Sequence, residues 1–327
     1  MIISASRRTD IPAFYSRWFY QRLEEGFVVT RNPFNANQLT KIRLDADVVD
    51  AIVLWTKNPA PMLDRLDELD ARGIPYYFQF TITPYGRDLE PRLPADKAVL
   101  VETFRELARR LGPERVIWRY DPILFSERYS RAFHERAFAR CASLLRGATE
   151  RVVISFLDMD YNNTKSIQRL GISDGSADEK SALAGRIAQI AGEAGMRVET
   201  CAEGIDLDAC GIAHGHCIDA DLIERISGRR LTPRGRAKDK GQRALCGCIG
   251  STDIGAYNTC MHGCAYCYAN FSQGSIQANC ARHDPDSPVL VGECDADALP
   301  FKKDQRSLFA DASGPAGSAG PEQMTLL

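Results

Sequence analysis

No apolar run in this sequence of 327 residues is long enough to cross a membrane as a helix. We expect no signal peptide, because Met1 leads directly into a short apolar stretch that is followed by Arg7 and Arg8. The sequence also lacks a strong charge of either sign, since its net charge is −2, and this argues against a protein that binds nucleic acid over its whole surface. We therefore expect a cytoplasmic globular protein without a membrane partner.

Cysteine is nearly absent before residue 200, where Cys141 stands alone, although the whole chain has 11 cysteines. In a chain without an export signal these residues do not indicate disulfides, because the cytosol keeps thiols reduced. Cys141 falls on a predicted helix with apolar neighbours and is expected in the core. The crowding of the other cysteines predicts metal sites confined to the C-terminal third of the chain.

The first 204 residues alternate apolar, strand-like runs with longer amphipathic stretches, and no internal repeat is present. Strands so uniformly apolar are typical of a parallel sheet covered by helices. Five or six βα units in this order predict an α/β fold with a full or partial (β/α) barrel over residues 1–204. The pattern places strands at 2–6, 48–59, 75–83, 116–125, 151–159 and 196–203, and helices at 14–25, 60–72, 95–111, 130–146 and 177–194. Residues 27–31 and 38–44 are predicted as a hairpin or as a strand with a loop.

Polar residues follow the predicted strands repeatedly, at the ends where a barrel of this kind carries its chemistry. Any one of them is as well explained by an ion pair or a helix cap on the rim. Their joint position is what favours a functional site. They are Arg7, Arg8, Thr9 and Asp10; Thr56, Lys57 and Asn58; Thr81 and Thr83; Arg119 and Asp121; Asp158 and Asp160; and Glu199, Cys201 and Glu203.

Three cysteines stand at C-x3-C-x2-C spacing within residues 257–270, namely Cys260, Cys264 and Cys267. A tight loop of this kind points three thiolates at one place, and thiolates are the ligands that iron–sulfur clusters and zinc select. Three ligands are one too few for a closed site, so a four-iron cluster held here would keep one iron open to a small molecule. The alternative is a structural zinc knuckle.

A second set of four cysteines is predicted from position. Cys246 and Cys248 form a C-x-C pair, Cys201 ends the last predicted strand, and Cys217 follows shortly after it. Our hypothesis is that these four bind a second metal centre, most simply a fully ligated four-iron cluster, with a four-cysteine zinc site as the alternative. Such a centre would relay electrons or attach the C-terminal segment to the barrel.

The chain changes character after residue 204. Residues 205–290 form a cysteine-rich segment that we expect to pack on the barrel mouth, and residues 291–327 are predicted as a loop-like tail, flexible from residue 309. Within this segment, residues 225–243 carry eight lysines and arginines against the single acid Asp239. That stretch is either a solvated loop or a contact for a polyanion.

Two resemblances follow from particular stretches of sequence. The chain resembles an uncharacterised bacterial family, domain of unknown function 1848, over roughly residues 1–290. The cysteine spacing, with Tyr266 before the third cysteine, resembles the signature of radical S-adenosylmethionine (SAM) enzymes. Four further stretches resemble the spore-photoproduct-lyase-type branch of these enzymes: TKNP at 56–59, the FTIT strand followed by Glu90 and Pro91, the RxDPI-like strand at 119–123 and YCYA at 266–269. The first resemblance rests on SASRRTDIPAFY, RNPFN, WTKNPAPM, QFTITPYG, VIWRYDPIL, ETCAE, KDKGQR and GAYNTCMHGCAYCYAN.

The second resemblance implies an activity and a cofactor. It implies a [4Fe-4S] cluster on the three loop cysteines, SAM on the open iron, an electron donor such as flavodoxin or ferredoxin, and a 5′-deoxyadenosyl radical that abstracts hydrogen from a small-molecule or peptide substrate.

Further residues become candidates for roles around that cofactor. Lys57 and Arg119 are candidates for the SAM carboxylate or an anionic substrate, and Asp121 and Glu199 for ribose hydroxyls or substrate amines. The remaining candidates for cofactor binding are Tyr266 and Tyr268, which would pack near the adenine or only shield the cluster, together with Arg7 and Arg8.

The chain departs from the radical SAM pattern in one respect. The cysteine loop of that family follows the first barrel strand, whereas here it comes after the last predicted strand. Either the cluster-bearing segment has moved to the C-terminus, or an independent ferredoxin-like module has been attached. The first hypothesis predicts that residues 260–267 lie over the barrel mouth, within reach of Lys57 and Arg119. The rival interpretation of the whole chain is a metal-stabilised module that binds nucleic acid through residues 225–243 without catalysis.

Overall fold

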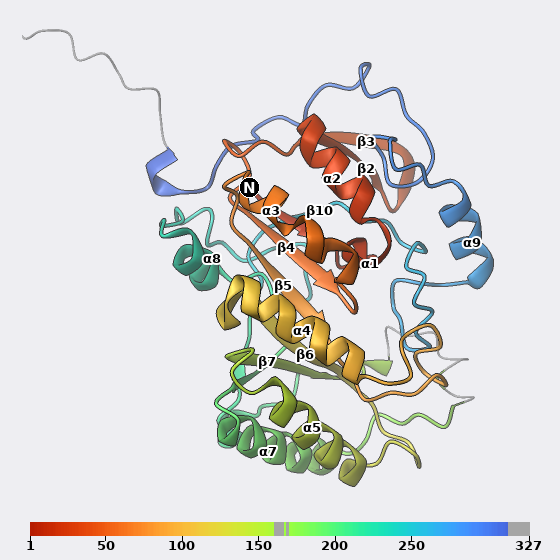
Figure 1. The fold of residues 1–327 in the computed structure, drawn as a ribbon, viewed down its shortest axis with the longest axis vertical. Helices are drawn as coiled ribbons and strands as arrows, with labels where there is room; N and C mark the ends of the chain where they lie inside the picture. The colour runs from red at the N-terminus through yellow and green to blue at the C-terminus, as the bar shows by residue number, and fades with distance from the viewer. Residues whose placement is uncertain (160–166, 168–169, 313–327) are drawn as a thin grey trace, which may run out of the picture.

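A single sheet of eight strands organises the molecule (Figure 1). The computed structural model describes residues 1–159, 167 and 170–312. Every pair of neighbouring strands in this sheet is parallel, and the order is β10-β1-β4-β5-β6-β7-β8-β9. The strands are β1 (Ile2–Ala5), β4 (Ala51–Thr56), β5 (Tyr76–Thr81), β6 (Val116–Ile123), β7 (Arg151–Phe156), β8 (Arg197–Thr200), β9 (Ala213–His214) and β10 (Thr252–Asp253).

The predicted α/β fold with a parallel sheet is therefore confirmed. The sheet of the described residues is open, because β10 and β9 stand at its two edges and each pairs with one neighbour. A closed barrel is not what these strands form. Both edge strands have only two residues, so they add few ladder hydrogen bonds. They are also too short to form an apolar run from which a strand could be predicted.

Alternation along the strands sorts their side chains onto two faces of the sheet. Ile3, Leu54 and Phe78 belong to the larger hydrophobic core, on what we call the helix face. Ile2 and Val53 belong to a second core on the opposite side, which we call the inner face. The strands read as continuous apolar runs because both of their faces are buried.

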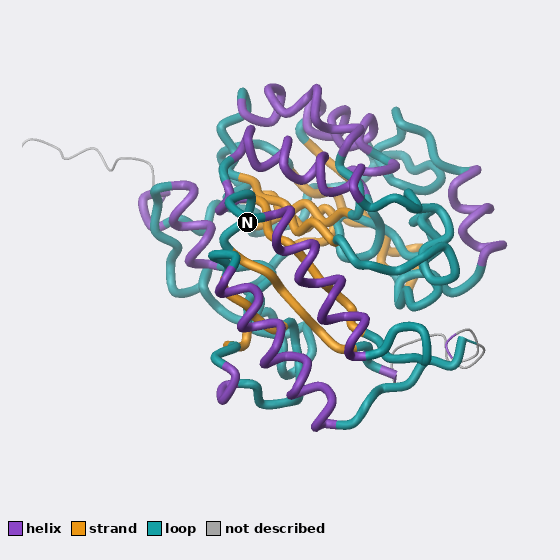
Figure 2. Tube along the Cα trace, turned by 60° about the horizontal axis from the view of Figure 1, so that its bottom comes forward, coloured by secondary structure: helices purple, strands orange, loops and turns teal. Residues whose placement is uncertain are grey.

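Helices cover the helix face. Figure 1 shows α4, α5 and α7 lying side by side across the sheet, and Figure 2 shows the same layer from another side. Each helix buries an apolar stripe, as the sequence pattern predicts. Their bounds are α4 (Ala98–Leu111), α5 (Arg131–Leu145) and α7 (Ala177–Glu193), the last opened by a capping box between Ser176 and Glu179.

The helix predicted at 14–25 is present as α2 (Ser16–Glu25). A short helix that was not predicted, α1 (Ile11–Phe14), precedes it and is capped by Asp10, which accepts a hydrogen bond from the Ala13 amide at 3.0 Å. The stretch at 60–72 starts as the 3-10 helix η1 (Ala60–Arg65) and continues as α3 (Leu66–Asp70). The predicted hairpin is present as the antiparallel pair β2 (Phe27–Asn32) and β3 (Asn35–Arg43).

The late part of the chain packs on the inner face. Ile218, Leu222 and Ile249 share the second core with Ile2 and Val53. This part contains more regular structure than the sequence suggested. Its elements are η4 (Asp208–Cys210), β9, α8 (Ala220–Ser227), β10, α9 (Gln273–Ala281) and η5 (Ala310–Ala312). Helix α8 covers the beginning of the basic stretch that was predicted to be a loop.

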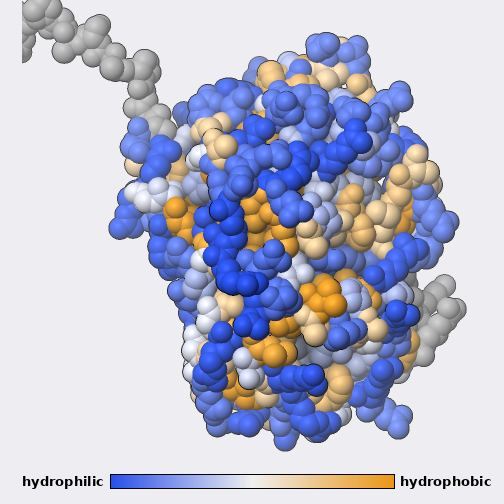
Figure 3. Space-filling model, in the orientation of Figure 1, coloured by the Kyte–Doolittle hydropathy of each residue, from blue (hydrophilic) through white to orange (hydrophobic). Residues whose placement is uncertain are grey.

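The predicted flexible tail requires a correction. Phe309 is buried in the second core and residues 310–312 form η5, so the chain is held against the inner face to that point. Residues 313–327 and Asp160 lie outside the described residues. Among the described residues, no helix is long and apolar enough to span a membrane. Figure 3 shows the side of the molecule seen in Figure 1, where hydrophilic residues surround smaller apolar areas.

Candidate functional site

Strand β10 places the cysteine loop, residues 260–267, at the carboxyl ends of the parallel strands. It pairs with β1 through Ile3 opposite Thr252 and Ser4 opposite Asp253, so the chain leaves β10 at the edge where β1 and β4 also end. Asp253 fastens this exit, because its carboxylate accepts 2.8 Å hydrogen bonds from the side chains of Ser4 and Ser6. Gly255 follows, where a side chain would collide with Ser6. The local sequence therefore brings a late segment beside the first strand.

The cysteine loop packs its three thiols against this edge. The Ala265 amide donates to the Leu89 carbonyl at 2.9 Å, and Cys264 contacts the small core around Tyr85 and Tyr266. Burial raises the pKa of Cys264 to about 12, although the cation of Lys57 opposes the rise. Burial likewise raises the pKa of the neighbouring loop cysteines. Metal coordination is the ordinary way to hold such buried sulfurs as thiolates.

Backbone amides of the loop point at its sulfurs. The His262 amide donates to Cys260, and the amides of Ala269 and Asn270 donate to Cys267. Both sets of donors lower the thiol pKa against the larger opposite effect of burial. Amide-to-sulfur hydrogen bonds are among the groups that stabilise charge on cluster ligands. The loop is thus built to support thiolates.

Lys57 lies directly beneath the cysteine loop. Its ammonium group is 2.8 Å from Glu90 and 3.0 Å from the Tyr266 hydroxyl, which itself donates to Glu90. Glu90 is fully buried and also pairs with Lys97 at 2.6 Å. Burial alone would raise the pKa of Glu90, but Lys57 and Lys97 more than offset it and lower the pKa to about 2. The predicted closeness of the loop to Lys57 is therefore present in the structure.

The other side of the loop is tied to the first helix. His262 is buried, and its Nε2 atom lies 2.8 Å from Asp10, whose carboxylate also accepts from the Lys57 amide at 2.7 Å. The His262 ring packs against Phe14 with a centroid distance of 4.6 Å. Asp10 thus connects the end of β1, the end of β4 and the loop. Its place after a strand was visible in the sequence, but its partner was not.

Arg119 and Asp121 lie beside Cys217 of the second cysteine set. The Arg119 guanidinium pairs with Asp121, and its Nη1 atom is 2.9 Å from the Cys217 sulfur. It stacks on the Trp55 ring at 5.3 Å, and Arg7 stacks on the same ring at 5.5 Å. Trp55 was not among the predicted site residues. Its alternation with Ala51 and Val53 was the signal that places it on the inner face.

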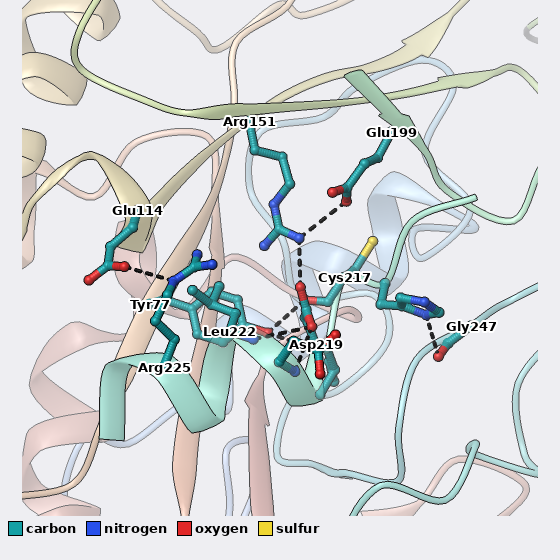
Figure 4. A network of polar contacts seen from close by, with 12 residues as sticks. Tyr77, Glu114, Arg151, Glu199, Cys217, Asp219, Leu222, Arg225 and Gly247 are labelled. Atoms are coloured by element: carbon teal, nitrogen blue, oxygen red, sulfur yellow. Dashed lines mark hydrogen bonds and ion pairs between the residues drawn. The ribbon is translucent and has the colours of Figure 1, made fainter. Parts of the chain in front are cut away.

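The other predicted site residues have these positions. The Tyr268 hydroxyl donates to the Arg7 carbonyl at 2.6 Å, which joins the loop to the end of β1. Arg8 stacks on Tyr257 at 5.3 Å. Glu199 pairs with Arg151 at 3.1 Å and with Arg197 at 3.0 Å, and Figure 4 shows Arg151 reaching from β7 to both Glu199 and Asp219. The carboxylate of Glu199 therefore already has two cationic partners.

The four cysteines of the second set, Cys201, Cys217, Cys246 and Cys248, lie together on the inner face. The sulfurs of Cys201 and Cys217 are 3.3 Å apart, and thiol hydrogen bonds join Cys217 to Cys248 and Cys248 to Cys246. All four are free thiols. In the part of the chain that the structure describes, no three His, Cys, Asp or Glu side chains surround one point as ligands of a single ion would.

The basic stretch at 225–243 is largely paired with acids. Arginines 225, 229, 230, 236 and 243 each form an ion pair with an aspartate or glutamate. Arg225 with Glu114 joins α8 to the start of β6, at 2.9 Å. The pairs of Arg225 and Arg243 tie the late segment to the earlier part of the chain, and the other three join residues within the late segment. They also reduce the positive field that a polyanion would meet.

Fold and site together define an α/β protein in which a late, cysteine-rich segment covers the inner face of a parallel sheet and ends at its carboxyl edge. The chain belongs to the family described as Domain of unknown function (DUF1848), whose model matches residues 2–269. The matched range runs from β1 through the cysteine loop, so the sheet and the loop both fall within it. No curated protein matches the chain.

Proposed function

We propose that this protein is a radical SAM enzyme, with a [4Fe-4S] cluster on Cys260, Cys264 and Cys267 and SAM bound at the iron that these residues leave open. The observation that carries the proposal is the position of a three-cysteine loop at the carboxyl edge of a parallel α/β sheet, directly above Lys57. In open parallel sheets and in α/β barrels, ligands bind at that edge.

The order of strands supports the proposal further. Because β10 lies beside β1, the cysteine loop follows the strand that precedes β1 in the sheet, although it comes late in the chain. A cluster-bearing segment moved to the C-terminus would occupy this place. A separately attached ferredoxin-like module would have no reason to contribute a strand to the sheet. The arrangement favours the former.

The donor set of the loop fits the cluster. Thiolates select iron–sulfur clusters and zinc, and the loop adds amide donors to the sulfurs of Cys260 and Cys267. A further cysteine, Cys280 on α9, has other contacts, since its thiol lies 3.4 Å from the Tyr15 hydroxyl and donates to the Thr259 carbonyl. We assign Cys280 to this structural contact and leave the cluster with three protein ligands.

When bound, the cluster supplies the electron that splits SAM at its sulfonium and so generates a radical able to abstract hydrogen. The chain's own residues bind and orient the reactants. The cations of Arg7 and Arg119, which stack on Trp55, would attract the carboxylate of SAM or of an anionic substrate. Lys57, held by Glu90, presents a positive charge below Cys264. Tyr266 and the buried residues around it exclude water from the cluster.

The proposal implies two partners. A small-molecule or peptide substrate would bind on the inner face beside Trp55, and a one-electron donor such as flavodoxin or ferredoxin would reduce the cluster. The rival function, nucleic-acid binding through residues 225–243, receives less support because most of the cations in that stretch are paired with acids.

The test is SAM cleavage under anaerobic conditions. Protein reconstituted with iron and sulfide, then reduced with dithionite, should convert SAM to 5′-deoxyadenosine and methionine, measured by liquid chromatography. The Cys264→Ala variant should lose the activity by at least about 100-fold, because it lacks a cluster ligand. The Cys280→Ala variant is the matched control and should retain cluster and activity.

Two results would overturn the proposal. One is a colourless protein with zinc on the loop that disappears in both the Cys264→Ala and Cys280→Ala variants, which would establish a closed four-cysteine zinc site. The other is an iron-loaded protein that produces no more 5′-deoxyadenosine than its Cys264→Ala variant.

A further inference from the structure

The second cysteine set, Cys201, Cys217, Cys246 and Cys248, is assembled from three separate parts of the chain. Cys201 directly follows β8, Cys217 follows β9, and the C-x-C pair comes from the segment before β10. Their sulfurs form a continuous row, from the 3.3 Å contact of Cys201 with Cys217 through Cys248 to Cys246. Three of the four residues are buried and Cys201 is partly buried.

The backbone around this set is fixed by polar contacts to the sheet. The Cys217 carbonyl accepts hydrogen bonds from Tyr77 at 2.8 Å and from Gln79 at 2.9 Å. Asp219, two residues on, pairs with Arg151 at 2.7 Å (Figure 4). Tyr77, Gln79 and Arg151 come from β5 and β7, so the inner face itself positions Cys217.

A second group of contacts joins Cys217 to the C-x-C pair. The Ile218 amide points at the Cys248 sulfur at 3.3 Å, and His216 Nδ1 lies 2.7 Å from the Gly247 carbonyl. Gly247 separates the two cysteines, and a side chain there would collide with the His216 ring. The glycine thus permits the close approach that brings Cys246 and Cys248 to Cys217.

Two guanidinium groups face the row of sulfurs. Arg119 Nη1 is 2.9 Å from the Cys217 sulfur, and Arg7 lies close enough to Cys248 and Cys217 to interact with their charges. The Nη2 atom of Arg7 is buried and has no hydrogen-bond partner among the described residues. Asp121 offsets part of the Arg119 charge. Neutral thiols are poor acceptors for buried cations, whereas four thiolates around a divalent centre carry a net charge of about −2 that cations would balance.

Simpler explanations account for less of this arrangement. The 3.3 Å between Cys201 and Cys217 is too long for a disulfide, whose sulfurs are about 2.05 Å apart. Buried cysteines that serve only as small hydrophobes would not need an arginine on the sulfur or an amide aimed at it. Four thiols brought side by side from three segments supply the ligand set of a structural metal site, and metal binding would draw the row of sulfurs around one centre.

We propose that Cys201, Cys217, Cys246 and Cys248 bind a second metal centre with four thiolate ligands, either a fully ligated iron–sulfur cluster or zinc. The centre holds the late segment on the inner face of the sheet, beside Trp55. It does not depend on the proposed activity, because none of its four ligands belongs to the cysteine loop.

The experiment removes the loop site and asks whether metal remains. The variant Cys260→Ala/Cys264→Ala/Cys267→Ala is purified anaerobically, and its iron, zinc and acid-labile sulfide are measured per chain. We expect either about four irons with four sulfides or about one zinc. X-ray absorption at the corresponding edge should show an all-sulfur first shell near 2.3 Å and, for the cluster only, iron–iron scattering.

A matched pair of variants tests the ligand assignment. Adding Cys246→Ala/Cys248→Ala to the loop variant should abolish the remaining metal, whereas adding Cys210→Ala/Cys294→Ala, which removes two cysteines outside both sets, should leave it. Circular dichroism checks that each variant is folded. A folded loop variant without metal, or metal that survives the loss of Cys246 and Cys248, overturns the proposal. Failure of SAM cleavage in the intact protein would bear only on the proposed function.

Discussion

Glu90 is the anion that compensates the positive charges of Lys57 and Lys97 beside the cysteine loop. It is fully buried, and its two oxygens are shared among Lys57, Lys97, Thr83 and Tyr266. Its pKa of about 2 means that it stays ionised throughout the physiological range. A buried ion pair of this kind contributes little by itself, but the loss of one partner leaves the other charge buried and uncompensated.

Glu90→Gln should therefore destabilise the protein strongly. We expect a loss of about 3 kcal/mol in the free energy of unfolding, because the variant leaves Lys57 and Lys97 without their anion. Glu102→Gln is the control, since it removes an exposed ion pair with Arg109 and should cost less than about 1 kcal/mol. Anaerobic urea unfolding followed by circular dichroism measures both. Equal losses in the two variants would contradict this account of Glu90.

His134 gives the protein a pH dependence away from the site. It is fully buried, with Nδ1 2.8 Å from the Tyr120 hydroxyl and Nε2 2.9 Å from the Leu124 carbonyl. Burial lowers its pKa from 6.5 to about 4. Between these values the unfolded chain binds a proton that the folded protein does not bind. The contribution of neutral His134 to the free energy of unfolding is therefore complete above pH 6.5 and is lost as the pH falls towards 4.

The wild-type protein should consequently lose stability between pH 7 and pH 4 in part through His134. The pKa difference corresponds to about 3 kcal/mol over that interval. His134→Gln should remove this portion of the pH dependence, whereas His214→Gln, at an exposed position, should keep it. Urea unfolding at several pH values provides the measurement. A variant at residue 134 with the wild-type pH profile would refute the assignment.

At the residue scale, the sequence predicted which cysteines group together and which polar residues lie at the ends of strands. It did not predict which residues these side chains contact. Spacing alone grouped Cys260 with Cys264 and Cys267, because all three belong to one loop. The pairing of Asp10 with His262 joins residues 252 positions apart, and only the fold brings them together. The two cations that stack on Trp55 were likewise beyond sequence reasoning, since no local pattern marks an aromatic platform.

Among the elements, the segment between α8 and β10 carries the most specific geometry. Its C-x-C pair approaches Cys217 only because Gly247 has no side chain to meet His216. Gly250, three residues on, has open space around its Cα position. The two glycines therefore form a natural pair for testing whether this approach matters.

Gly247→Ala should disrupt the second cysteine set, and Gly250→Ala should not. We expect the first variant to lower the free energy of unfolding by about 1–3 kcal/mol, as overpacking commonly does, and to reduce the metal that remains in the loop variant. The second should change the stability by less than about 0.5 kcal/mol. Metal analysis and urea unfolding of the two variants are compared directly. If the two variants behave identically, the His216 ring can move aside without loss of stability, and the contact between Gly247 and His216 does not position the cysteines.

The regular elements of the first 204 residues were predicted well because their signals are long. Strands β4, β5 and β6 are apolar on both faces, and α4 has a pronounced apolar stripe. Strands β9 and β10 escaped prediction because two residues give no period to detect. Helix α8 was hidden by the arginines around it, which the structure explains as ion-pair partners of nearby acids.

For the whole molecule, the decisive feature is that the start of the chain meets two late segments, around residues 252–253 and 307–308, at the sheet. β10 pairs with β1, the amino group of Met1 contacts Asp50, and Ser307 and Leu308 bind the same aspartate. The sequence predicted a parallel α/β sheet but left open whether the late cysteines belonged to it or to a separate module. The pairing of β10 with β1 shows that the late segment contributes a strand to the sheet. This pairing could not be predicted, because a strand of two residues has no recognisable sequence pattern.

The central claim is an open iron on the cysteine loop, facing the edge of the sheet. It is tested most directly by electron paramagnetic resonance of the reduced Cys246→Ala/Cys248→Ala variant, in which signals from the second site are removed, recorded before and after SAM is added. We predict the signal of a reduced four-iron cluster whose g values shift when SAM binds. A spectrum that SAM leaves unchanged, or a folded protein with no iron signal at all, would contradict the claim.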